Sequence, residues 1–144
     1  MKNIRLAVLL ALCMAVVGCV TEKSKKAMDE MSDDRSLMLL VGSYSEPGDS
    51  SLRAYRFDVA TGNAEYIGAV PVANASYFTQ SDSGILYVVT ESDSVQSALT
   101  AVRIDTESGV PEVLNTVTVG SAAPCYVAVS PDGRFAVTAN YDGG

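Results

Sequence analysis

The sequence of 144 residues contains no histidine. Imidazole is the commonest general base and the commonest zinc ligand, so a Ser-His-Asp triad, an HExxH site or a zinc finger cannot be built from these residues. This absence excludes three large classes of site within the chain. It says nothing about any sequence beyond the last residue.

Basic residues are also scarce. There are 10 Lys and Arg against 17 Asp and Glu, which gives a net charge of -7, and no basic cluster lies outside the N-terminal tail. Such a chain has no electrostatic reason to approach phosphates, so nucleic acid is not expected as a partner. The hydrophobic fraction of 48% is that of an ordinary globular protein.

The three cysteines do not form a disulfide framework. Cys13 and Cys19 fall in the N-terminal segment, which leaves Cys125 alone in the remainder of the chain. We expect Cys125 to be a small buried residue, and no base or cation accompanies it that would make it a nucleophile.

The N-terminal pattern predicts a targeting signal. Lys2 and Arg5 precede an apolar run from Leu6 to Val17 that is too short to span a bilayer comfortably. The run ends in Val16–Cys19, which resembles a bacterial lipobox, where the cysteine is acylated and becomes the new N-terminus. We therefore expect a lipoprotein signal peptide in residues 1–18 and a lipid anchor on Cys19 that holds the exported protein on the membrane of the cell envelope. A plain secretory signal and a buried N-terminal helix are the alternatives.

Removal of the signal would leave 8 basic and 17 acidic residues, so the exported part is acidic. Residues 19–36 are mostly charged or small and are expected to form a flexible tether. The folded domain is expected in residues 37–144.

Internal repeats dominate this domain. Residues 76–91 align with residues 125–140 at an offset of 49, and residues 52–62 align with residues 99–109 at an offset of 47. Each aligned segment is a strand that runs into a tight turn containing glycine. Four short strands in a repeat of this length are typical of β-propeller blades, and a β-sandwich with coincidental turn similarity is the alternative.

The repeats predict an all-β domain. Its nine expected strands are Leu37–Tyr44, Leu52–Asp58, Glu65–Pro71, Tyr77–Ser81, Ile85–Glu91, Ala98–Asp105, Val113–Val119, Tyr126–Ser130 and Phe135–Tyr141. The 108 residues from 37 to 144, divided by a repeat of about 48, give about two and a quarter blades. Since a closed propeller needs typically 4 to 8 blades, we expect open blade faces and uncovered strand edges.

Six short segments carry a resemblance to a known family. They are Val41–Tyr44, Asn74–Tyr77, Val89–Glu91, Pro124–Val127, Ser130–Arg134 and Ala139–Gly144. In this order and spacing the domain resembles the N-terminal third of the seven-bladed propeller lactonases typified by bacterial 6-phosphogluconolactonase. The resemblance implies hydrolysis of a sugar lactone in a cleft near the propeller axis, without a cofactor.

Two residues of these segments are the candidate catalytic groups. Glu91 ends a strand where the family often has glutamate, and its carboxylate could act as a base or orient a sugar hydroxyl. Tyr126 stands where the family commonly has histidine, and its phenol could donate a hydrogen bond to an oxyanion or stack on a sugar ring. The structural alternatives are an inter-blade hydrogen bond or a solvated strand end for Glu91, and packing at the channel for Tyr126.

Asn140 and Tyr141 are the candidate substrate-binding residues, because they end the matching strand of the last blade and their polar groups could face the channel. A turn cap is the alternative role for Asn140. Asp132 with Gly133, and Asp82 with Gly84, are expected to shape turns and to take no part in chemistry. No metal site is expected.

Two functions from different classes remain open at this stage. The first is an exported lactonase-like hydrolase, present here as a fragment that we expect to be inactive because most of the cleft is absent. Its ligand outside the cytosol would be a non-phosphorylated sugar lactone or an envelope glycan. The second is a lipid-anchored propeller that serves as a ligand-binding or protein-interaction module.

Overall fold

The computed structural model describes residues 36–45, 48–93 and 96–142. The expected signal peptide, Cys19 and almost all of the tether lie outside these ranges. The described residues form strands and turns. They contain no helix that is long and apolar enough to cross a membrane. Residues 37–144 form one compact unit.

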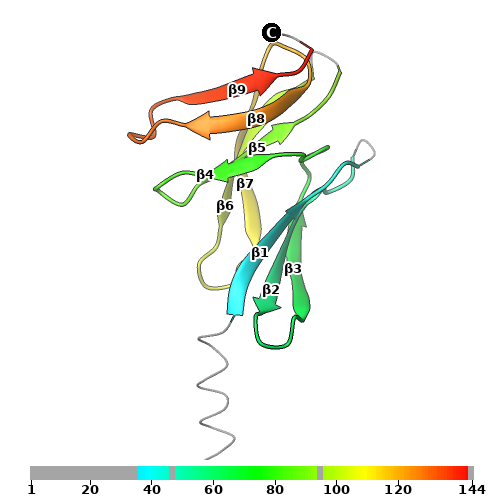
Figure 1. The fold of residues 1–144 in the computed structure, drawn as a ribbon, viewed down its shortest axis with the longest axis vertical. Coiled ribbons are helices and arrows are strands. Elements are labelled where there is room, and N and C mark those ends of the chain that lie inside the picture. The colour runs from blue at the N-terminus through cyan, green and yellow to red at the C-terminus, as the bar shows by residue number, and fades with distance from the viewer. Residues whose placement is uncertain (1–35, 46–47, 94–95, 143–144) are drawn as a thin grey trace, which may run out of the picture. The chain divides into compact units, whose positions relative to one another are not determined.

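Nine strands follow one another along the chain (Figure 1). They are β1 (Ser36–Gly42), β2 (Leu52–Asp58), β3 (Ala64–Val70), β4 (Phe78–Gln80), β5 (Leu86–Thr90), β6 (Ala98–Ile104), β7 (Pro111–Thr118), β8 (Pro124–Val129) and β9 (Ala136–Asn140). Every strand predicted from the repeats is present, with its ends within two residues of the prediction.

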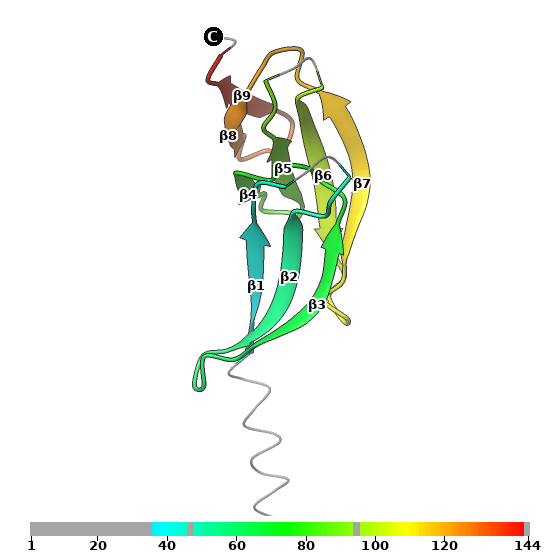
Figure 2. The ribbon, with the colours of Figure 1, turned by 90° about the vertical axis from the view of Figure 1, so that its right-hand side faces the viewer.

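The strands form three antiparallel sheets in simple meander order. The first sheet is β1-β2-β3, the second is β4-β5-β6-β7, and the third is β8-β9. The three sheets stand beside one another as successive blades in the two views (Figures 1 and 2). Three, four and two strands make nine, or two and a quarter four-stranded blades, so the prediction of partial propeller blades is confirmed.

The repeat extends to irregularities of the sheets. The β2–β3 pairing shifts its register between Ala54 and Tyr55, and the β6–β7 pairing shifts between Ala101 and Val102. The two sites are 47 positions apart, which is the offset of the sequence repeat. A β-bulge increases local strand twist, so the first two blades share the same bend at the same place.

The turns between these strands are shaped by aspartate. The Asp58 carboxylate accepts hydrogen bonds from the backbone N–H of Ala60 and Thr61, and Asp105 accepts equivalent bonds from Glu107 and Ser108. Each turn closes on a glycine with positive φ, Gly62 at 75° and Gly109 at 77°. Only glycine adopts this conformation without steric cost, which is why both repeats place it there.

The β4–β5 and β8–β9 turns are built by two Ser-x-x-Gly segments, Ser81–Gly84 and Ser130–Gly133. In the β8–β9 turn, Asp132 Oδ1 accepts from the Ser130 hydroxyl and the Arg134 N–H, and Gly133 N–H donates to the Ser130 carbonyl. In the β4–β5 turn, Gly84 N–H donates to the Ser81 carbonyl. These residues therefore have the structural roles that the sequence predicts for them.

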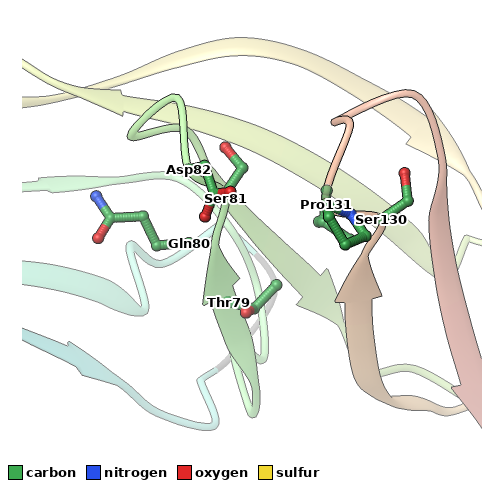
Figure 3. A pocket seen from close by; sticks show the side chains of 7 residues that line it. Thr79, Gln80, Ser81, Asp82, Ser130 and Pro131 are labelled. Carbon is green, nitrogen blue, oxygen red and sulfur yellow. The ribbon is translucent and has the colours of Figure 1, made fainter.

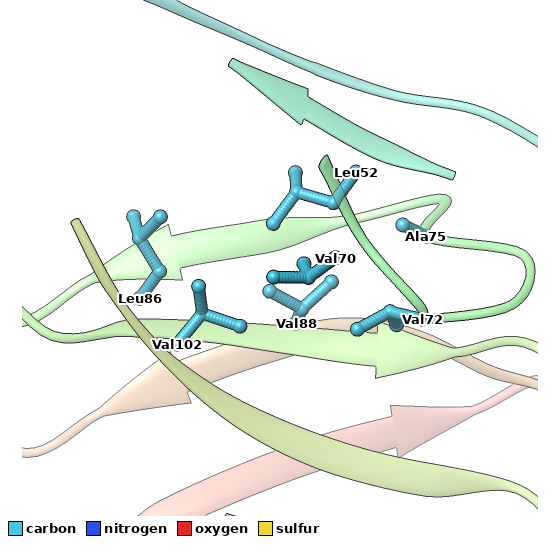
Figure 4. Close-up of a cluster of buried hydrophobic side chains, with 7 residues drawn as sticks. All are labelled: Leu52, Val70, Val72, Ala75, Leu86, Val88 and Val102. Carbon is cyan, nitrogen blue, oxygen red and sulfur yellow. The ribbon is translucent and has the colours of Figure 1, made fainter. Parts of the chain in front are cut away.

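The hydrophobic core lies between the first two blades (Figure 4). Its seven buried side chains come from both sheets and from the connection between them: Leu52, Val70, Val72, Ala75, Leu86, Val88 and Val102. Burying a Leu or Val side chain contributes about 1.5–3 kcal/mol, so this cluster is the main attachment between the two blades.

The outer faces of the first and third blades are uncovered. Leu37 and Met38 on β1 and Val137 on β9 are exposed. In the second blade, Leu114 and Val117 on the outer strand β7 are exposed as well. The expectation of open blade faces agrees with this distribution.

One burial prediction is wrong: Cys125 is exposed, not buried. The β8–β9 pairing passes from Pro124 opposite Asn140 to Tyr126 opposite Ala139, so Cys125 is the extra residue of a bulge. Its Sγ donates to the Ala139 carbonyl at 3.6 Å and remains exposed. The bulge breaks the in-and-out alternation of β8 at this residue.

Candidate functional site

One end of the blades gathers the candidate residues. In an antiparallel meander alternate loops lie at the same end of the sheet, so the β1–β2, β3–β4, β5–β6 and β7–β8 loops and the end of β9 share one side. We call this side the loop rim and define it by six residues: Tyr44, Ser45, Asn74, Glu91, Ala123 and Tyr141.

Hydrogen bonds join the loop rim from blade to blade. Asn74 Oδ1 accepts from the Ser45 N–H at 2.9 Å, and Asn74 Nδ2 donates to the Glu91 carbonyl at 2.9 Å. The Glu91 N–H donates in turn to the Asn74 carbonyl at 3.1 Å. Asn74 therefore holds the loops of the first two blades together and fixes the backbone of Glu91 on both sides.

The loop that carries Asn74 is anchored to the first blade by a buried serine. The Ser51 hydroxyl donates to the Val72 carbonyl and accepts from the Ala75 N–H at 2.9 Å. Ser51 is fully buried. A buried hydroxyl with both roles satisfied resists local opening, so the anchor limits the movement of the Asn74 loop.

The third blade continues the series. The Ala123 N–H donates to the Ser92 carbonyl at 2.8 Å, and the Ala123 carbonyl accepts from the Tyr141 N–H at 2.8 Å. Ala123 is the repeat equivalent of Asn74, 49 positions later, and both have a left-handed backbone, with φ of 54° and 47°. Alanine has no side-chain amide, so it cannot repeat the side-chain links that Asn74 makes.

Glu91 has a specific partner from the preceding blade. The Tyr44 hydroxyl donates to Glu91 Oε2 at 3.0 Å. This hydrogen bond raises the pKa of Tyr44, because it stabilises the protonated phenol, and partial desolvation and the negative charge of Glu91 act in the same direction. The inter-blade hydrogen bond considered from the sequence is therefore present, and it occupies only one carboxylate oxygen.

Ser76 lies beside this pair. Its hydroxyl oxygen is buried and has no hydrogen-bond partner of normal geometry among the described residues. It is nevertheless close enough to Tyr44 to oppose slightly the rise in the pKa of that phenol. A buried hydroxyl without a partner can accept or donate one hydrogen bond to a ligand.

Tyr126 contacts its own repeat equivalent. The rings of Tyr77 and Tyr126 have centroids 4.8 Å apart and are tilted by 40°. The residues are 49 positions apart, so the repeat places two tyrosines side by side, one directly before β4 and one in β8. Burial raises the pKa of Tyr77, and the Tyr126 hydroxyl adds to this effect. The structure thus shows the packing role of Tyr126, and its ring remains 47% exposed.

Asn140 and Tyr141 point in different directions. The Asn140 side-chain oxygen is buried and lacks a partner among the described residues, whereas the Tyr141 ring is 83% exposed. Neighbouring residues at a strand end face opposite sides, so only one of the two can face the interior of the blades. Asn140 is that residue.

The opposite end of the blades holds a shallow cavity of about 200 Å³ (Figure 3). The β4–β5 and β8–β9 turns line it: Thr79, Gln80, Ser81, Asp82, Val129, Ser130 and Pro131. Gln80, Ser81 and Ser130 make hydrogen bonds within these two turns, so the cavity is a gap between the turns. No cluster of three or more Cys, Asp or Glu that could bind a metal occurs in the described part of the chain.

Three residues of this arrangement were not among the sequence-derived candidates: Tyr44, Asn74 and Tyr77. Each belongs to a segment that carried the family resemblance, but its role depends on contact between blades. The offset of 49 between Tyr77 and Tyr126 was a signal that could have identified one of these contacts.

Together, the meander sheets, the repeated bulges and the hydrogen-bonded loop rim define the chain as part of a β-propeller. The chain belongs to the lactonase family of seven-bladed β-propellers, whose model matches residues 38–144. It is 30% identical over 106 residues to the 6-phosphogluconolactonase of Bacillus subtilis, an alignment that covers 72% of this chain and 30% of that protein.

Solved structures agree with this assignment. A candidate 6-phosphogluconolactonase of Bacteroides uniformis superposes with a TM-score of 0.68 at 35% identity, over 76% of this chain and 32% of that one. The periplasmic gluconolactonase of Pseudomonas aeruginosa gives a TM-score of 0.66 at 31% identity, over 73% and 31% of the two chains. The chain thus spans about a third of the length of the relatives it matches.

Proposed function

We propose that the chain supplies part of a lactonase that opens a sugar lactone by hydrolysis. The support is membership of the family together with relatives that carry the names 6-phosphogluconolactonase and gluconolactonase. The observation that carries the proposal is the Glu91 carboxylate, which lies on the loop rim with one oxygen bonded to Tyr44 and the other without a partner among the described residues.

The reaction requires a base and an oxyanion donor. Water attacks the lactone carbonyl, its proton passes to a base, and the ring C–O bond breaks to give a carboxylic acid and a hydroxyl group. Glu91 takes the role of base, since its carboxylate lies on the loop rim with only one oxygen occupied by Tyr44. The Tyr126 phenol donates to the developing oxyanion, and Asn140, whose buried side-chain oxygen lacks a partner among the described residues, contacts a sugar hydroxyl.

The proposed substrate is a neutral lactone. Three of the described arginines lie beside carboxylates on the strands and turns, Arg56 with Glu65, Arg103 with Glu112, and Arg134 with Asp132. Arg53 donates to the Ser43 hydroxyl. The six residues of the loop rim thus offer a carboxylate, phenols and an amide, and Arg53 beside Ser43 is the one basic side chain that a described hydrogen bond places at their border. A single guanidinium among these groups suits hydroxyl groups better than a phosphate.

Export supports the same choice of substrate. The N-terminal signal and the lipobox at Cys19 would place the protein in the cell envelope, and one relative is described as periplasmic. Phosphorylated sugar lactones arise in the cytosol, so an exported enzyme would meet non-phosphorylated lactones or envelope glycans.

The 144-residue chain alone is proposed to be inactive, because two and a quarter blades leave most of an axial cleft unbuilt. The test compares this chain with the longest product of the same gene, using 1,5-gluconolactone and a pH indicator to follow acid release. Glu91→Gln in the longer product should lower kcat by about a hundredfold or more. Glu65→Gln, on an exposed strand position, is the matched control and should keep full activity. Equal activity of the short chain, or full activity of Glu91→Gln, would contradict the proposal.

A binding module is the second candidate, and a specific observation favours it. The exposed Tyr77–Tyr126 pair is an aromatic surface where the family commonly has histidine, and tyrosine rings bind sugar faces without chemistry. If the longer product fails to accelerate lactone opening above buffer but binds envelope glycans by calorimetry, and Tyr126→Ala abolishes that binding, this second function replaces the first.

A further inference from the structure

Two anchors hold Glu91, and the first is on its backbone. Its backbone is fixed by two hydrogen bonds to Asn74, the N–H to the Asn74 carbonyl and the carbonyl to the Asn74 amide. Backbone fixation alone does not fix a carboxylate, because the Glu side chain has three rotatable bonds. A second anchor is needed at the carboxylate itself.

Tyr44 provides that second anchor. Its hydroxyl donates to Glu91 Oε2 across the boundary between the first and second blades, 47 residues away in sequence. No described basic side chain lies within ion-pair distance of Glu91, so the phenol is the partner that fixes the carboxylate. With Oε2 occupied, Oε1 is the oxygen left to accept a proton.

The phenol is itself restrained. Ser45, the next residue along the chain, donates its N–H to Asn74 Oδ1, and Ser43, the residue before, donates its N–H to the Ser51 carbonyl at 3.0 Å. The Tyr44 backbone is therefore held on both sides, as the Glu91 backbone is. Two side chains fixed at their bases and joined at their tips form a preorganised pair.

We propose that Tyr44 is a positioning residue for Glu91: it holds one carboxylate oxygen so that the other faces the water or hydroxyl group from which a proton is taken. This proposal rests on the proposed function of Glu91. It assigns Tyr44 no contact with the reacting atoms. It also makes the site a product of two blades, so neither blade carries it alone.

The first test measures the pair without requiring activity. Tyrosine labelled with ¹³C at Cζ gives one signal for each of the seven tyrosines, and Tyr44→Phe identifies the signal of Tyr44. Glu91→Gln removes the charge and weakens the hydrogen bond, so the Tyr44 signal should titrate at lower pH than in the wild type. Cys125→Ser is the control for the other nearby titrating group, and it should shift the Tyr44 signal less, because Glu91 is the larger influence. An unchanged Tyr44 titration in Glu91→Gln would overturn the proposal.

The second test uses kinetics of the longer gene product. Tyr44→Phe should lower kcat by about tenfold or more with little change in KM, since misplacement of a catalytic group by about 1 Å can cost a hundredfold in rate. Tyr66→Phe, an exposed tyrosine on β3, is the matched control and should keep kcat. A thermal melt of each variant shows that it is folded.

The two tests separate the two claims. A wild type without lactonase activity refutes the proposed function, and the NMR titration still decides whether Tyr44 holds Glu91. An active wild type with full kcat in folded Tyr44→Phe refutes the positioning role and leaves the proposed function intact. If Tyr44→Phe does not fold, the titration of the seven labelled tyrosines in folded Glu91→Gln decides instead, and the proposal is overturned when none of their signals moves to lower pH.

Discussion

Gly42, the last residue of β1, lies so close to the backbone carbonyl of Ala75 that a Cβ atom on Gly42 would overlap that oxygen. Gly42 directly precedes the loop of Tyr44, and Ala75 directly follows Asn74. The close approach therefore sets the distance between the two loops that hold Glu91. A family segment that the sequence shows as Val41–Tyr44 thus has a steric reason for its glycine.

Gly42→Ala should destabilise the folded domain. The carbonyl of Ala75 belongs to the backbone, so one of the two loops must move, and overpacking of this kind costs about 1–3 kcal/mol or more. Urea unfolding followed by circular dichroism measures the change in the free energy of unfolding. Gly68→Ala is the matched control, because its Cβ would meet only side chains, Pro111 at 3.3 Å and Val110 at 3.8 Å, and no backbone atom. A loss no larger than that of the control would show that the close approach is unimportant.

Ala123→Asn should stabilise the domain. Ala123 has φ of 54°, a left-handed conformation that costs alanine about 1–2 kcal/mol and that asparagine tolerates better. Its repeat equivalent Asn74 has φ of 47° and links two blades with its amide. We expect a gain of up to about 1 kcal/mol in the free energy of unfolding.

Ala128→Asn, at an exposed strand position without positive φ, is the control and should give no gain. If both variants destabilise the domain equally in the same urea titration, the backbone strain at Ala123 has no measurable cost.

The strands were predictable because their limits are local. Asp58 and Asp105 end their strands with turns that require only a carboxylate and a glycine within five residues, and such signals are written in the sequence. The repeat then fixed the order of the sheets, because each meander connects neighbours.

The contacts between blades were not predictable in the same way. The Tyr44–Glu91 hydrogen bond depends on the rotation between two sheets, which no turn motif encodes. The exposure of Cys125 depends on a bulge, and a bulge shifts the register without leaving a mark in the pattern of apolar residues. Ala123 gives no sign of its left-handed backbone, since alanine is rare in that conformation.

Lipidation is predicted at Cys19. Expression of the chain in a bacterial host with radiolabelled palmitate should label the wild type and Cys13→Ala but not Cys19→Ala, because only the cysteine of the lipobox is acylated. Globomycin, which blocks cleavage of lipoprotein signals, should cause the longer precursor to accumulate. Label retained by Cys19→Ala, or cleavage at another position, would favour a plain secretory signal.

Acid should weaken the domain through its turn aspartates. The backbone N–H and hydroxyl of Ser108 hold the pKa of Asp105 below its ordinary value of 3.8, and the Ser130 hydroxyl lowers the pKa of Asp132 in the same way. A carboxyl with a lower pKa in the folded state binds fewer protons there than in the unfolded chain. The stabilisation is therefore complete above the unfolded value, near pH 4, and is lost as the pH falls through the lower folded value.

Ser108→Ala removes one hydrogen bond to Asp105 and raises its pKa toward the ordinary value. The urea midpoint of this variant should therefore fall less between pH 6 and pH 3 than that of the wild type, while Ser108→Thr, which keeps the hydroxyl, should follow the wild type. Parallel losses in all three proteins would mean that these turns do not contribute to the acid sensitivity.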